Sequence, residues 1–168
     1  LAVIKHYNAA IDQFGQELKA IMVYQDLKDK LPEIDIMSGP QYMRDFEKAY
    51  DKTSDLLAKI EAMYETALLD VAHEEAKAKF ERATEYFKEK GILVGNVKDS
   101  AALRESYLPL DELYMAAKEK VAALKALKKW LDNMLESFKM AHDDAKKIYD
   151  KCTSGPSGRS GYGGMSSR

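Results

Sequence analysis

The chain has 168 residues, a length that suits one domain. Its 26 Lys and Arg stand against 28 Asp and Glu, and the net charge of −2 excludes a strong global basic field that would attract nucleic acid. The single cysteine, Cys152, excludes an intrachain disulfide, and with no membrane-length apolar run and no secretory signal we expect no membrane association and a cytoplasmic location.

The first predicted element is a helix over about residues 2–30. Ala, Lys, Glu, Leu and Asp dominate the composition, which is typical of an all-α or coiled-coil chain. Pro32 ends the helix, because the residue before a proline avoids the α region. Apolar residues recur at steps of three and four, the spacing of one helix face: Ile4, Tyr7, Ile11, Phe14, Leu18 and Ile21.

A much longer helix is predicted over residues 40–90. Pro40 suits its first turn, and apolar residues keep a heptad rhythm as far as Val71, after which the stripe drifts to Phe80, Ala83 and Phe87. About fifty residues at about 1.5 Å each give a length of about 75 Å. That length indicates a coiled-coil arm rather than a compact globule.

The chain then turns back. We expect Gly91 to end the helix with a left-handed backbone, and Asp99 or Ser100 to cap a short helix over 100–107. Pro109 breaks or kinks it, and the last helix is predicted over 110–151. Residues 153–168, TSGPSGRSGYGGMSSR, predict a flexible Gly/Ser-rich tail.

These elements predict a long antiparallel helical hairpin in a single domain, 1–152, with the first helix making a three-helix bundle at one end. At the other end two helices cannot cover their apolar stripes, so we expect another copy of the chain to do so. The expected contact residues of this homo-oligomer are Phe87, Ile92, Leu93, Val94, Leu108 and Leu110. Alternatively, the Ile92–Val94 triplet folds back and plugs the tip.

The sequence contains no complete motif of a catalytic or metal-binding site. Asp70 and His73 have the spacing of half a di-iron site, but no second such pair accompanies them. Cys152 has no evident base beside it, and Gly91 and Gly95 match no phosphate-binding loop. We therefore expect no catalytic residue, cofactor or metal.

Cations and rings interleave near the predicted turn. Single-stranded nucleic acid is bound by such mixtures, in which cations track phosphates and rings stack on bases. Glutamates alternate with the cations, however, which also fits a solvated helix face with i, i+4 ion pairs. The candidate nucleic-acid-binding residues are Lys79, Arg82, Tyr86, Lys88 and Lys90.

Two segments, KAKFERATEYFKEKG (77–91) and YLPLDELYMAAKEKVAALKALKKWLDNMLESFKMAHDDAKKI (107–148), resemble the UvsY-like recombination mediators of T4-type phages. The resemblance covers about residues 40–150. It implies a non-enzymatic ring-shaped oligomer that binds single-stranded DNA and helps to load a RecA-like recombinase. It also implies that Lys79 and Arg82, ahead of Tyr86 and Phe87, contact the DNA. The extra N-terminal helix, the Gly/Ser tail and the acidic body depart from that family.

The alternative function is structural. In that hypothesis the coiled-coil arm binds only protein, and the chain is a scaffolding element that associates with itself and ignores nucleic acid. The two hypotheses share the homo-oligomer and differ in whether the tip binds single-stranded DNA.

Overall fold

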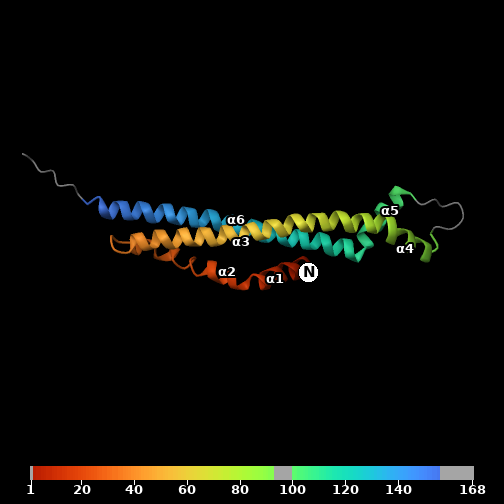
Figure 1. Cartoon of the computed structure of the whole chain (residues 1–168), viewed down its shortest axis with the longest axis horizontal. Coiled ribbons are helices and arrows are strands. Elements are labelled where there is room, and N and C mark those ends of the chain that lie inside the picture. Colours follow the sequence, from red (N-terminus) through yellow and green to blue (C-terminus); the bar gives the residue numbers. More distant parts are fainter. Residues whose placement is uncertain (1, 93–99, 156–168) are drawn as a thin grey trace, which may run out of the picture.

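The computed structural model describes residues 2–92 and 100–155, and its described regular elements are all helical. Two long helices, α3 (Gly39–Lys77) and α6 (Glu112–Thr153), run side by side in opposite directions and form an elongated rod (Figure 1). The predicted all-α antiparallel hairpin is confirmed. Within the described residues, no helix has both the length and the apolar character that a membrane crossing needs.

The outgoing half of the hairpin continues beyond α3 through a π-helical turn, η2 (Ala78–Arg82), into α4 (Ala83–Glu89). Gly91 ends it with a φ of 66°, the left-handed backbone that favours glycine. The Ile92 N–H donates to the Phe87 carbonyl at 2.9 Å and the Gly91 N–H to the Lys88 carbonyl at 3.1 Å. This pair of bonds is a Schellman motif, so the predicted role of Gly91 as terminator is confirmed.

The returning half begins with α5 (Ala101–Tyr107), capped by the Ser100 hydroxyl, which accepts from the Leu103 N–H at 3.2 Å. A single 3-10 turn, η3 (Leu108–Leu110), then leads to α6. Asp111 caps α6 by accepting from the Tyr114 N–H at 2.8 Å. Both helices lie within about two residues of their predicted bounds, but Leu93, Val94 and the tail from 156 onward lie outside the described residues.

The N-terminal part is broken where one continuous helix was predicted. It consists of α1 (Ala2–Gln13), α2 (Gly15–Met22) and the 3-10 helix η1 (Lys28–Glu33), with turns between Met22 and Lys28. Phe14 leaves helical geometry at φ −106° and ψ 20°, next to Gly15, whose helix propensity is low. The breaks let this segment bend along the hairpin while Ala10, Phe14 and Ile21 stay buried, whereas Ile4, predicted to belong to the same stripe, is exposed.

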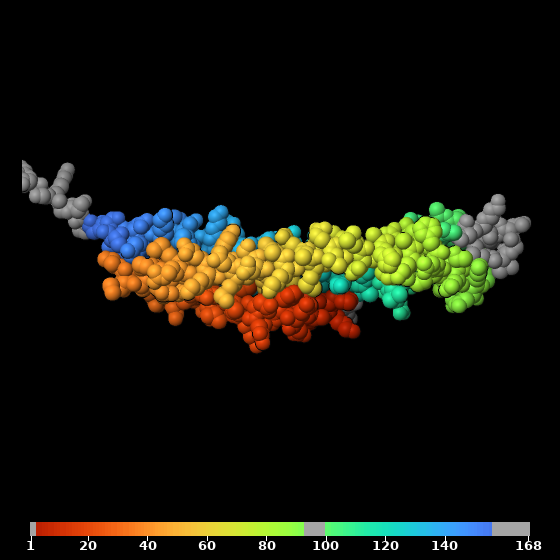
Figure 2. Space-filling model, viewed as in Figure 1, coloured from red at the N-terminus to blue at the C-terminus, as the bar shows by residue number. Residues whose placement is uncertain are grey.

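The core lies in the seam between α3 and α6, and α1 and α2 cover part of one side of it (Figures 1 and 2). Ala10, Phe14 and Ile21 join the same core, so the predicted three-helix section is confirmed. A smaller cluster of Ala78, Leu108 and Tyr114 lies near the tip. The main seam is built from large buried side chains of the two long helices: Phe46, Leu56, Ile60, Leu124, Leu127, Leu131 and Phe138.

We expect Phe138→Ala to lower the free energy of unfolding by about 3–5 kcal/mol, because it leaves a cavity in the seam. Met140, two residues away on α6 and 58% exposed, provides the control. Met140→Ala should change stability by no more than about 0.5 kcal/mol. Urea unfolding followed by circular dichroism measures both, and equal losses would contradict the assignment of Phe138 to the core.

Candidate nucleic-acid interface at the hairpin tip

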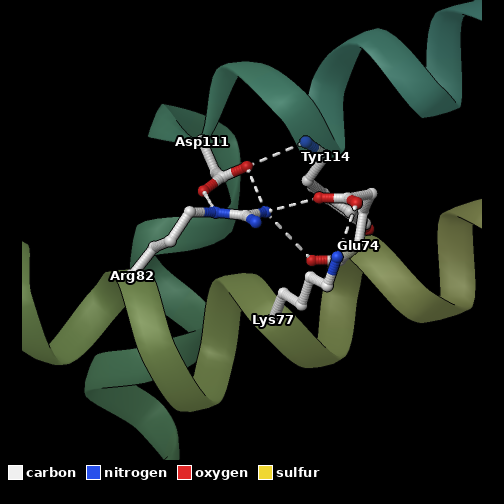
Figure 3. Close-up of polar contacts among 5 residues, drawn as sticks. All are labelled: Glu74, Lys77, Arg82, Asp111 and Tyr114. Carbon is white, nitrogen blue, oxygen red and sulfur yellow. Dashed lines mark hydrogen bonds and ion pairs between the residues drawn. The ribbon is translucent and has the colours of Figure 1, made fainter.

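Arg82, one of the two cations expected to contact DNA, forms ion pairs with carboxylates of the same chain. Its Nε lies 2.6 Å from Asp111 Oδ2 and its Nη2 lies 2.8 Å from Asp111 Oδ1, a bidentate fork that ties η2 to the start of α6 (Figure 3). Nη2 also lies 3.0 Å from Glu74 Oε2 and donates to the Glu74 carbonyl oxygen at 3.2 Å. Arg82 therefore joins the two halves of the hairpin rather than facing a ligand.

Asp111 is the centre of this arrangement, and its side chain is 2% exposed. Burial alone would raise the pKa of its carboxyl, but hydrogen bonds from Arg82 and the Tyr114 N–H outweigh that effect, so the pKa lies below its ordinary value. The same carboxylate thus caps α6 and neutralises Arg82. The hydrogen bond to Asp111 likewise raises the pKa of Arg82.

Lys79, the other cation expected to contact DNA, lies between two carboxylates. Its Nζ is 2.6 Å from Glu105 Oε1 on α5 and 2.7 Å from Glu75 Oε1 on α3. Both hydrogen bonds raise the pKa of Lys79, and the one to Glu105 has the larger effect. A phosphate that approached Lys79 would meet the negative charge of both carboxylates.

Tyr86 takes part in an aromatic cluster with its neighbours. Its ring centroid is 5.5 Å from that of Phe87 and 5.1 Å from that of Tyr107. Lys90 Nζ lies 5.7 Å from the centroid of the Tyr86 ring, and both Lys88 and Lys90 are exposed. Of the five candidate residues, the two lysines are thus the ones whose side chains face solvent.

Phe80, which the apolar rhythm assigned to the buried stripe, is 68% exposed, and Arg104 Cζ lies 5.3 Å from its ring centroid. The π-helical turn explains the difference, because its extra residue moves the buried face to Ala78 and Ala83. Phe80 and Arg104 are therefore candidate residues in addition to the five predicted from the sequence.

The expected subunit-contact residues separate into two groups. Phe87 and Leu108 are buried within the chain, whereas Ile92 and Leu110 are 41% and 57% exposed. Leu93 and Val94 lie outside the described residues. Burial corrects the expectation that Phe87 and Leu108 present their side chains to a partner in this conformation.

Asp70 and His73 have the spacing of half a di-iron site, and the structure places them as follows. Asp70 Oδ2 lies 3.9 Å from Lys120 Nζ, and His73 is exposed. Among residues 2–92 and 100–155, no three His, Cys, Asp or Glu side chains form a group that could hold a metal ion.

Comparisons of the chain with protein-family models, with curated proteins and with solved structures find no match.

We expect Asp111→Asn to lower the free energy of unfolding by about 2 kcal/mol near neutral pH, since Arg82 loses the more closely bound of its two charged partners while remaining partly buried. The folded pKa of Asp111 lies below its ordinary value of 3.8. Its contribution is therefore full above that value and is lost as the pH falls through the folded pKa. The difference from the unsubstituted chain should narrow in acid.

Urea unfolding at about pH 7 and about pH 3 measures this difference. Asp132→Asn, at an exposed position of α6, is the matched control and should leave stability nearly unchanged at both values. A loss of stability by Asp111→Asn that is equally large in acid would contradict the electrostatic explanation.

Proposed function

We propose that the chain is a non-enzymatic, self-associating cytoplasmic protein that binds single-stranded DNA at the tip of its hairpin. In keeping with the UvsY-like resemblance, its role is to help load a RecA-like recombinase. The observation that carries the DNA-binding part is the exposed ring of Phe80 with the Arg104 guanidinium over it.

An exposed aromatic ring beside a cation suits a nucleobase and its phosphate. Base–aromatic stacking tolerates any base, because every base has a π-face, and a guanidinium adds both charge and a planar surface. Phe80 belongs to η2 and Arg104 to α5. Helix α5 also contacts α4, whose last turn holds the exposed Lys88 and whose C-cap is the exposed Lys90. The tip therefore combines one stacking surface with nearby exposed cations.

Self-association is part of the proposal because it would increase the number of cations that the assembly offers to one DNA strand. Lys79 and Arg82 are neutralised by carboxylates within the chain, so one copy offers few cations to a DNA backbone. Copies held together on one strand would add their contacts and raise the apparent affinity.

A structural or scaffolding role is the second candidate, and the pairing of Lys79 and Arg82 with carboxylates favours it. In that role the rod associates with other copies, and the tip has no ligand. An assembly whose mass and stability do not respond to a single-stranded oligonucleotide would support this function over the first.

Phe80→Ala should weaken binding of fluorescein-labelled oligo-dT on the order of tenfold, because a base loses its stacking partner. Phe80→Trp keeps a ring and should bind within about twofold of the unsubstituted chain. Met37→Ala, an 88% exposed position that precedes α3 at the other end of the rod, controls for loss of any exposed apolar side chain. Unchanged affinity of Phe80→Ala in fluorescence anisotropy would contradict the stacking role.

Lys88→Ala/Lys90→Ala should make binding less sensitive to salt. Each lysine that neutralises a phosphate contributes about 0.7 to the slope of log affinity against log salt for a single strand, so the slope should fall by about 1.4 per copy. The matched control is Lys48→Ala/Lys52→Ala, which removes the same charge from exposed positions of α3 away from the tip. Equal slopes for the two double variants would argue against phosphate contact at the tip.

A further inference from the structure

One side of the hairpin carries a groove of about 250 Å³ between α3 and α6. Its floor includes Phe46 and Phe138, and Tyr50 on its rim is 41% exposed. Among the described residues, none from α1 or α2 lines this groove. It is therefore a part of the seam that the chain's own third layer leaves open.

The two walls of the groove carry opposite charges. One face of α3 is formed by residues spaced four and three apart, which are residues 47, 51, 54, 58, 61 and 65. This acidic row holds Glu47, Asp51, Glu61 and Glu65 and no cation. Along α6, residues 128, 132, 135, 139, 142 and 146 form a basic row with Lys128, Lys139, His142 and Lys146, in which Asp132 is the only acid.

Two contacts show that these rows face each other, one across the groove at Glu47 and His142 and one farther along the seam, outside the groove lining. Glu61 Oε1 lies 2.8 Å from Lys128 Nζ, and Glu47 Oε1 lies 3.4 Å from His142 Nε2. Between these pairs, Asp51 and Lys139 line the groove but form no ion pair within 4 Å among the described residues. In the middle of the groove, the acidic wall and the basic wall thus carry charges that form no ion pair among the described residues.

We propose that this groove is where a second copy of the same chain docks. A two-fold axis parallel to the rod places α3 of each copy on α6 of the other, so each acidic row meets a basic row. Because the axis keeps residues at the same height along the rod, Asp51 of one copy lies opposite Lys139 of the other. The closed contact is isologous, and the four long helices form a bundle.

The arrangement of charge and apolar surface selects a copy of the chain over an unrelated partner. A partner that fits this groove must present a basic edge opposite Glu47 and Asp51, an acidic edge opposite Lys139, and apolar side chains between them. The groove itself has those edges in that order. Docking would cover Tyr50 in the centre, while the charged rims oppose other registers and orientations.

Two charge reversals test the interface. Lys139→Glu places acid on acid and Asp51→Lys places base on base, so each variant alone should have half the mass of the unsubstituted assembly in sedimentation or light scattering. An equimolar mixture should regain the full mass, because every contact between unlike copies is then between opposite charges. Lys48→Glu, an exposed reversal on another face of α3, should keep the full mass.

Circular dichroism establishes that each variant is folded, and recovery in the mixture excludes simple misfolding as the cause of dissociation. Assemblies of unchanged mass for both single variants, or a mixture that fails to recover, would overturn this interface.

The inference rests on the self-association in the proposed function, yet the two can fail separately. An unsubstituted chain that is monomeric removes both the interface and that part of the proposal. An assembly that ignores both reversals removes the interface alone. Oligo-dT binding and its loss in Phe80→Ala are read independently of either outcome.

Discussion

The packing of α3 against α6 is the constraint on which the remaining features depend. Two helices side by side bury one stripe each and leave two flanks of their seam open to solvent. In this chain α1 and α2 cover part of one flank, and Phe14 and Ile21 enter the shared core there. The other flank and the tip keep apolar side chains at the surface, and both proposed binding surfaces lie there.

Closing the tip decides which cations remain available. The π-helical turn carries Arg82, which reaches across to Asp111, and the same carboxylate begins α6. A bidentate pair around a 2% exposed carboxylate is a strong junction between the two halves of the hairpin. A guanidinium committed in this way is a poor phosphate ligand, which shifts the candidate contacts from Lys79 and Arg82 to the exposed Phe80, Lys88 and Lys90.

Periodicity and breaker residues were enough to predict the hairpin. Gly91 ends the outgoing half and Ser100 restarts the chain, because each residue has a local backbone or capping role that needs no tertiary information. The position of Phe80 could not be predicted in this way. Ala76, Phe80, Ala83 and Phe87 keep regular helical spacing, so they read as one stripe. The π turn, whose extra residue exposes Phe80, occurs where Arg82 pairs with Asp111, a tertiary contact that helical spacing does not reveal. The break at Phe14 is similar, since burying that ring depends on the seam it packs against.

The orientation of the proposed dimer has a consequence for the tip. An axis parallel to the rod keeps both copies pointing the same way, so their tips lie at the same end of the assembly. An axis perpendicular to the rod would instead put the tips at opposite ends, some tens of ångströms apart given the length of such helices. Only the parallel arrangement brings two sets of Phe80, Lys88 and Lys90 within reach of one short strand. In the proposed function, a chain with a net charge of −2 and with Lys79 and Arg82 already paired would gain from this doubling, because the second tip would bind at a high effective concentration. The flank that joins the copies and the tip that meets the strand would thus act together while sharing no residue.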